Sequence, residues 1–273
     1  MQTHLVPRAL QGTSRPDKDV QVLFSVQPSS KAVLFIHGFS GDAIDTWSEF
    51  PLLLPVANRC QGHDLYFYGY DGLRADMTSS AALFRDFLDR LFSPTAQLVN
   101  GNLPAAAQRP ASFAYDKMIV VAHSLGAVIT RRALLDATRL GRDWATKIQM
   151  LLFAPAHKGA NVADLALEAA SGFKFVRLFG IFARFESPLI DQLKPGSDVL
   201  KNLLDETVEA RRNGANLHLK AHKVIIAEYE KIVRNETFGD DPPPESIPDT
   251  THTSVCKPRV DFRRPLEFLE DCL

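Results

Sequence analysis

The feature that most constrains the fold is an apolar run that passes through a serine into a helix-forming segment, VVAHSLGA at residues 120–127. Runs that are apolar at successive positions suit strands buried on both faces of a parallel sheet. Ala122 and Gly126 stand two residues before and two after Ser124, where bulky side chains would clash in a tight turn from strand to helix. The run therefore predicts a buried strand, a sharp turn at Ser124 and a helix.

The same alternation of short apolar runs and helical segments recurs along the chain. Strands are predicted at residues 20–26, 32–37, 64–70, 118–123, 148–153 and 223–227. Helices are predicted at residues 79–92, 124–138, 163–170, 197–213 and 265–271. This order predicts an α/β fold, with a mostly parallel central sheet and helices on both faces.

Three further segments give expectations of their own. The sequence TWSE at residues 46–49 precedes an apolar segment and predicts a capping box that starts a helix. The Pro- and Ala-rich residues 93–116 predict a surface insertion. Residues 158–196 are long for a simple crossover and predict a helical cap. We expect one α/β domain over residues 1–273 that includes this cap.

Composition excludes several classes of function. The chain has 273 residues with 31 basic and 32 acidic side chains, so no global field draws it to nucleic acid. Its three cysteines have no CxxC spacing, and their odd number argues against a disulfide framework. The N-terminus has no apolar core typical of a secretory signal, and residues 173–185 are too short and too charged to span a bilayer. A cytoplasmic protein with no metal and no organic cofactor is expected.

Ser124 and residues 37–41, HGFSG, predict a nucleophile with an oxyanion hole. A serine on a strained strand-to-helix turn presents its hydroxyl above the sheet, and the Leu125 N–H at the helix start faces a developing oxyanion. In the earlier loop, the Phe39 N–H is the candidate second donor, and Gly38 lets the main chain approach a substrate carbonyl. His37 is expected to brace this loop. The alternative is a serine that only caps the helix.

Chain order selects the other members of a triad. The order serine, acid, histidine leaves four histidines after Ser124, and only His252 follows both a strand and an acid candidate. The strand at residues 223–227 ends next to Glu228 and Glu230, at the edge where active sites of parallel sheets gather. Glu230 is our choice of acid. The alternatives left open are Glu228, Asp240, Asp241 and Asp249.

These motifs resemble the α/β-hydrolase superfamily, in particular its lipase and esterase branch, which includes glycosylphosphatidylinositol-deacylase-like and serine-active-site lipase-like proteins. The resemblance rests on HGF at residues 37–39, AHSLG at 122–126, APAHKG at 154–159, LKPGS at 193–197 and THTSVCKP at 251–258. The last segment is similar to the family's histidine loop and implies His252 as base. Members of the family carry a Gly-x-x-Asp-x-x-Val pattern at the acid, which resembles residues 227–233 and implies Glu230.

Together these features predict a serine hydrolase that cleaves carboxylic esters through an acyl-enzyme. The substrate is a small-molecule or lipid ester. An acyl pocket or a lipid contact is expected to involve Phe175, Phe179 and Phe182. Contact of the protein with a membrane surface therefore stays open. The oligomeric state also stays open. Two alternatives stay open. They are a thioesterase or amidase with the same triad, and a catalytically silent binding module on the same scaffold.

Overall fold

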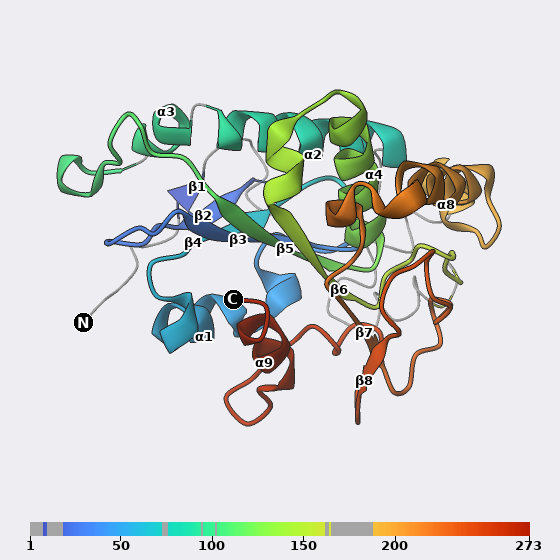
Figure 1. Ribbon diagram of the computed structural model, residues 1–273. Helices are drawn as coiled ribbons and strands as arrows, with labels where there is room; N and C mark the ends of the chain where they lie inside the picture. The colour runs from blue at the N-terminus through green and yellow to red at the C-terminus, as the bar shows by residue number, and fades with distance from the viewer. Residues whose placement is uncertain are drawn as a thin grey trace.

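The structure, a computed structural model, describes residues 8–9, 19–72, 76–93, 95–101, 103–161, 164 and 188–273. Its centre is an eight-stranded sheet in the order β1-β2-β4-β3-β5-β6-β7-β8 (Figure 1). The strands are β1 (Arg8–Ala9), β2 (Gln21–Leu23), β3 (Lys31–Ile36), β4 (Asp64–Tyr68), β5 (Lys117–His123), β6 (Ile148–Phe153), β7 (Lys223–Ala227) and β8 (Glu245–Ile247). β2 runs antiparallel to both of its neighbours, and all other pairs are parallel.

Helices cover both faces of the sheet. They are α1 (Phe50–Leu53), α2 (Met77–Phe92), α3 (Thr95–Asn100), α4 (Leu125–Arg139), α7 (Pro188–Leu193), α8 (Asp198–Ala210) and α9 (Arg264–Glu270). Figure 1 shows α2, α4 and α8 on one side of the sheet, and α1 and α9 on the other. The central strands β3 and β5 are therefore buried almost throughout, as their continuous apolar sequences require. The predicted α/β fold with a mostly parallel sheet is confirmed.

The start of the first helix differs from the prediction. α1 begins at Phe50, and its N-cap is Glu49, whose side chain makes no capping bond. The Thr46 hydroxyl instead accepts the Asp42 N–H at 3.0 Å, inside the loop that follows β3. The capping box predicted at residues 46–49 is wrong, because the loop uses Thr46 and the chain enters α1 through Pro51 at its first turn.

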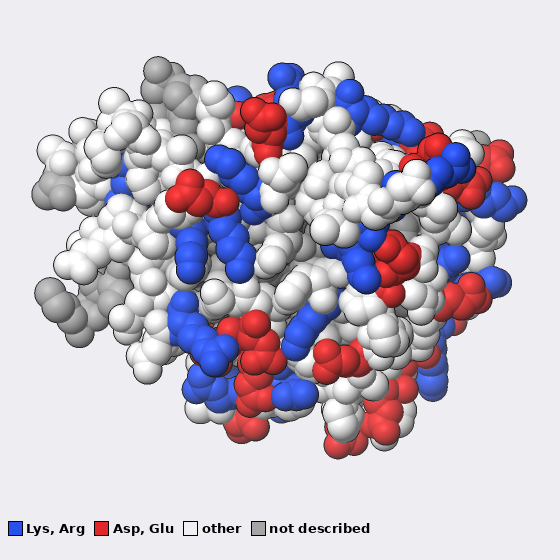
Figure 2. Space-filling model, in the orientation of Figure 1, with Lys and Arg blue, Asp and Glu red and all other residues white. Residues whose placement is uncertain are grey.

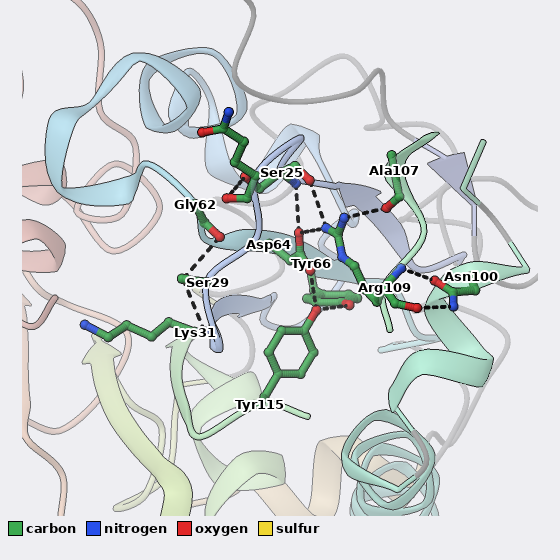
Figure 3. Close-up of polar contacts among 11 residues, drawn as sticks. Ser25, Ser29, Lys31, Gly62, Asp64, Tyr66, Asn100, Ala107, Arg109 and Tyr115 are labelled. Atoms are coloured by element: carbon green, nitrogen blue, oxygen red, sulfur yellow. Dashed lines mark hydrogen bonds and ion pairs between the residues drawn. The ribbon is translucent and has the colours of Figure 1, made fainter. Parts of the chain in front are cut away.

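The expected surface insertion at residues 93–116 is anchored in the core. It contains α3, and Val99 and Leu103 are buried. Arg109 is also buried, and its guanidinium donates to the Asp64 carboxylate at 2.9 Å (Figure 3). The insertion therefore carries a buried cation, which its Pro- and Ala-rich composition does not indicate.

The Asp64 carboxylate is satisfied by several donors besides Arg109. The Tyr115 hydroxyl donates at 2.5 Å and the Ser25 N–H at 2.8 Å (Figure 3). Burial raises the pKa of Asp64, and the charge of Arg109 and these hydrogen bonds oppose that rise. The network lies at the beginning of β4, which is the opposite edge of the sheet from the strand ends described below.

Most of the predicted cap lies outside the described residues, as does the helix expected at residues 163–170 apart from residue 164. The described parts of residues 158–196 are residues 158–161, residue 164 and residues 188–196, which include α7. The described helices include none with the length and apolar character needed to cross a membrane.

Candidate active site

Strand register brings four loops to one edge of the sheet. Ile36 at the end of β3 pairs with Ala122 in β5, and His123 pairs with Phe153 at the end of β6. The loop after β3 therefore runs beside Ser124. β7 and β8 are parallel to these strands, so the loops that follow them reach the same edge. The loop after β7 carries Glu230, and the loop after β8 carries His252.

Ser124 occupies the sharp turn predicted between β5 and α4. Its φ of 51° and ψ of −118° lie in a region that residues with a side chain rarely adopt. The turn is possible because Gly126 has no side chain, since a Cβ there would lie 2.4 Å from the carbonyl oxygen of Ile36. Gly38 is also close to the turn, since a Cβ there would lie 2.8 Å from Ser124 Cβ. Gly38, which precedes Phe39, and Leu125, the first residue of α4, therefore both adjoin Ser124.

Ser124, His252 and Glu230 form a continuous chain of hydrogen bonds. His252 Nε2 lies 3.0 Å from Ser124 Oγ, and His252 Nδ1 lies 3.2 and 3.1 Å from the two carboxylate oxygens of Glu230. Ser124 and His252 are each 1% exposed, and the Glu230 side chain has no exposed area. A carboxylate at Nδ1 keeps the ring proton there, so Nε2 accepts the proton of the serine hydroxyl.

The backbone holds Glu230 in this position. Its Oε1 accepts the N–H groups of Ile232 at 2.9 Å and Val233 at 3.1 Å. Burial alone would raise the pKa of the Glu230 carboxyl, but the hydrogen bond and charge of His252 and the two backbone donors lower it overall. The group is therefore a carboxylate at neutral pH, and the turn at residues 230–233 accommodates a side chain one methylene longer than aspartate.

The other acid candidates lie elsewhere. Glu228 is exposed and accepts the Asp249 N–H at 2.9 Å, so it supports the loop that leads to His252. Asp240 pairs with Arg211, and Asp241 pairs with the buried Arg131. Asp249 is exposed on that loop. Among the carboxylates considered, Glu230 is the one that the structure brings to His252.

Two further histidines support the loops around Ser124. The buried His37 donates from Nδ1 to the Gly38 carbonyl at 2.8 Å, and its ring stacks on Tyr70. His123, which precedes the serine, donates from Nε2 to the backbone carbonyl of His252 at 2.9 Å. Burial and the neighbouring His252 hold the pKa of His123 well below its usual range, so it stays neutral. Sequence reasoning missed this contact, although His123 stands in the most distinctive motif of the chain.

His157 and three phenylalanines are the other residues that the sequence singles out. His157 is buried, and its Nε2 lies 3.1 Å from the Ala127 carbonyl and 3.3 Å from Arg131 Nε, which indicates a structural position. Phe175, Phe179 and Phe182 lie outside the described residues. Within the described ranges no group of three His, Cys, Asp or Glu side chains is arranged to hold a metal ion.

No model of a protein family matches the sequence. The chain is similar to protein SERAC1 from Bos taurus and from Mus musculus, with 21% identity over 280 and 283 residues, respectively. These stretches cover 90% of this chain and 40% of each relative. The chain therefore spans about two fifths of the length of the curated relatives that it matches.

Several solved structures have the same fold. The mature lipase BlEst2 of Bacillus licheniformis superposes with a TM-score of 0.53 and 15% identity, covering 96% of both chains. The peroxisomal alpha-beta-hydrolase Lpx1 of Saccharomyces cerevisiae superposes with a TM-score of 0.53 and 10% identity, covering 98% of this chain and 88% of that one. Esterase B of Lactobacillus rhamnosis gives 0.51 and 12%, covering 98% and 83%. At such identities the likeness concerns the fold, and on that ground the chain is an α/β-hydrolase-fold protein.

Proposed function

We propose that the protein is a serine hydrolase that cleaves carboxylic esters, with Ser124 as nucleophile, His252 as general base and Glu230 as its acid partner. The observation that carries this proposal is the hydrogen-bonded chain from Ser124 Oγ through the His252 ring to Glu230. The strained backbone of Ser124 adds support, because such strain persists where the surrounding structure imposes it and is concentrated at functional sites.

The geometry supports acyl transfer in two halves. His252 Nε2 takes the hydroxyl proton as Ser124 Oγ attacks the ester carbonyl, and the protonated imidazole then gives that proton to the departing alcohol. In the second half a water molecule gives a proton to His252 as its oxygen attacks the acyl-enzyme carbonyl. The imidazolium then gives that proton to Ser124 Oγ as the acyl–oxygen bond breaks, which releases the acid and restores the serine hydroxyl. Glu230 stabilises the imidazolium in both halves, because its carboxylate lies within 3.2 Å of Nδ1. The Phe39 and Leu125 N–H groups are the proposed donors to the oxyanion.

The comparisons support an ester as substrate. Two of the solved relatives are named a lipase and an esterase, and both share the fold over almost the whole of this chain. Their names are the ground for placing a carboxylic ester ahead of a thioester or an amide, since the same triad attacks all three. Both a lipid ester and a small-molecule ester are consistent with these names.

The test is labelling of the purified protein and of its Ser124→Ala variant with a fluorophosphonate probe, followed by hydrolysis of short- and long-chain p-nitrophenyl esters. We expect the wild type to label and to turn over ester, and the variant to lose labelling and on the order of a millionfold in turnover. A variant with intact turnover would refute the role of Ser124. If neither protein labels or hydrolyses ester, a binding module on this scaffold replaces the enzyme as the best account.

A further inference from the structure

A groove of about 570 Å³ lies beside the loop that carries Glu230. We call it the acid-loop groove. Its walls combine the side chains of Lys194, Lys231 and Arg234 with the apolar residues Ala160, Ile232 and Val233. None of the described residues that line it is acidic. The face of the molecule seen in Figure 2, in contrast, has positive and negative side chains interspersed.

Two chain paths connect the acid-loop groove to the triad. Ile232 and Val233 form part of its wall, and their N–H groups hold the Glu230 carboxylate. On the other path, the Ala156 N–H donates to the Ser124 carbonyl at 3.2 Å, and Ala160 in the groove wall follows four residues later. Four residues span at most about 14 Å, so Ala160 in the groove wall lies within about that distance of Ala156, which contacts Ser124.

The charge of the groove is only partly neutralised. Lys194 pairs with Asp191 at 2.6 Å, but both side chains are largely exposed, and such pairs contribute little and exchange readily. Asp164 accepts from the amide of Asn161 at the groove's edge. No ion pair joins Lys231 or Arg234 to another residue in the described part of the chain. Two cations of the groove are therefore without an acidic partner among the described residues.

We propose that the acid-loop groove binds a negatively charged group of the substrate, a carboxylate or a phosphate, so that the enzyme prefers anionic esters. This inference rests on the proposed function and adds the substrate class to it. Arg234 presents a planar fork that matches either anion, and Lys231 adds a point charge. The apolar side chains of Ile232 and Val233 lie beside the cations, which suits an ester with a short hydrocarbon segment between its carbonyl and its anion.

The test compares matched neutral and anionic esters. On the acyl side the pair is p-nitrophenyl butyrate and p-nitrophenyl hemiglutarate, and on the alcohol side it is monobutyrin and butyryl glycerol phosphate. We expect at least one anionic member to have the higher kcat/KM, and the pair that shows the preference identifies which end of the substrate lies in the groove. The preference should weaken as salt is added, because exposed charges are screened.

Variants assign the preference to the groove. The double variant Lys231→Gln/Arg234→Gln should lower the anionic-to-neutral ratio of kcat/KM roughly three- to tenfold, the effect of losing two exposed charge contacts. The exchange Lys231→Arg/Arg234→Lys keeps both charges and should retain the preference. Lys220→Gln removes an exposed cation that does not line the groove and is the matched control. Melting temperatures and fluorophosphonate labelling show that each variant is folded.

The outcomes separate this inference from the proposed function. Hydrolysis without anionic preference, or a preference that the double variant keeps, overturns the groove while Ser124 remains the nucleophile. To cover the case of no hydrolysis, binding of glycerol phosphate and of glycerol to the wild type and the double variant is measured by calorimetry. Anion binding that the double variant loses then supports the groove although the hydrolase proposal fails, and equal binding by both proteins overturns the groove.

Discussion

At the scale of single residues, Glu230 is the candidate whose role is most open to a sharp test. Glu230→Gln keeps an oxygen for the Ile232 and Val233 N–H groups but can turn an amide donor towards His252 Nδ1, which favours the wrong ring tautomer. We expect kcat to fall on the order of 10⁴-fold with KM little changed, measured on p-nitrophenyl butyrate. Glu228→Gln is the matched control and should stay within about tenfold of wild type. Equal losses in both variants would argue against Glu230 as the acid.

His123 is predicted to act as a positioning residue, through its hydrogen bond to the His252 carbonyl. His123→Ala leaves this buried carbonyl without its donor, at a cost to the free energy of unfolding of about 1–3 kcal/mol. We expect kcat to fall while KM changes little, because the His252 ring loses its fixed distance from Ser124. His123→Gln carries an amide donor at a similar reach and should restore most of kcat. A glutamine variant as slow as the alanine variant would indicate a role other than this bond.

The hydrogen-bonded arrangement of Ser124, His252 and Glu230 could be predicted because these residues are separable by motif and chain order. Ser124 stands in a motif, and His252 is the one downstream histidine that follows both a strand and an acid candidate. The contact of His123 could not be predicted in this way, because it joins residues 129 positions apart through a backbone carbonyl, which carries no sequence signal. The same holds for the support that Glu228 gives to Asp249.

At the scale of elements, the turn between β5 and α4 depends on the absence of a side chain at Gly126. A Cβ there would lie 2.4 and 2.5 Å from the carbonyl oxygens of Ile36, the last residue of β3, and of His37, which follows it; both are backbone atoms with little room to move. Gly126→Ala is therefore expected to cost about 3 kcal/mol or more of unfolding free energy and to abolish labelling of Ser124. Urea denaturation measures the first effect. A variant as stable as wild type would show that the packing of α4 against β3 is looser than described.

Arg109 supplies the positive charge that joins residues 93–116 to Asp64 of β4. Arg109→Leu would leave the buried Asp64 carboxylate without its cation, at a cost of about 3–5 kcal/mol in urea denaturation. The double variant Arg109→Leu/Asp64→Leu should recover much of this loss, since neither charge is then buried alone. Fluorophosphonate labelling of folded Arg109→Leu should persist, because the network lies at the opposite edge of the sheet from Ser124. Lost labelling in a folded variant would contradict that separation.

The elements differ in how well the sequence predicts them. The six predicted strands are confirmed. A short continuous apolar run has to be buried, and a strand inside a sheet buries both of its faces. β8 was missed, since its three residues, Glu245–Ile247, lie in a polar, Pro-rich stretch and form a strand only by pairing with β7. Residues 46–49 match a capping pattern, but the Thr46 hydroxyl accepts a hydrogen bond from the Asp42 N–H in the preceding loop and does not cap a helix.

At the scale of the whole molecule, buried neutral histidines make stability depend on pH. Burial, followed by the neighbouring charges, holds the pKa of His123 and of His157 well below their usual range. In the unfolded chain both return to a pKa of about 6.5, so below that pH the unfolded state binds protons that the folded state does not. The free energy of unfolding should therefore fall on acidification, by up to about 1.4 kcal/mol per pH unit for each histidine.

Urea denaturation at several pH values from 7.5 to 5 measures this slope. Glu230 affects the free energy of unfolding in a different pH range. Because its pKa is lowered in the folded state, its contribution to stability is lost only as the pH falls below about 4.3, the value in the unfolded chain. His123→Gln removes one of the two histidines, so the slope of the free energy of unfolding against pH above pH 5 should fall by the contribution of one bound proton. A wild-type stability that is constant from pH 7.5 to 5 would contradict the burial of both rings as neutral groups.

The placement of the site across the sheet also determines when it can first exist. Ser124 follows β5 in the middle of the chain, whereas His252 and Glu230, the proposed base and acid, follow β8 and β7, more than one hundred positions later. During synthesis, an emerging polypeptide presents its serine long before residue 252 has left the ribosome. A serine hydroxyl without an adjacent base is a poor nucleophile, so the nascent chain is chemically inert towards the esters around it. The hydrolysis proposed above can therefore begin only after β7 and β8 have joined the sheet.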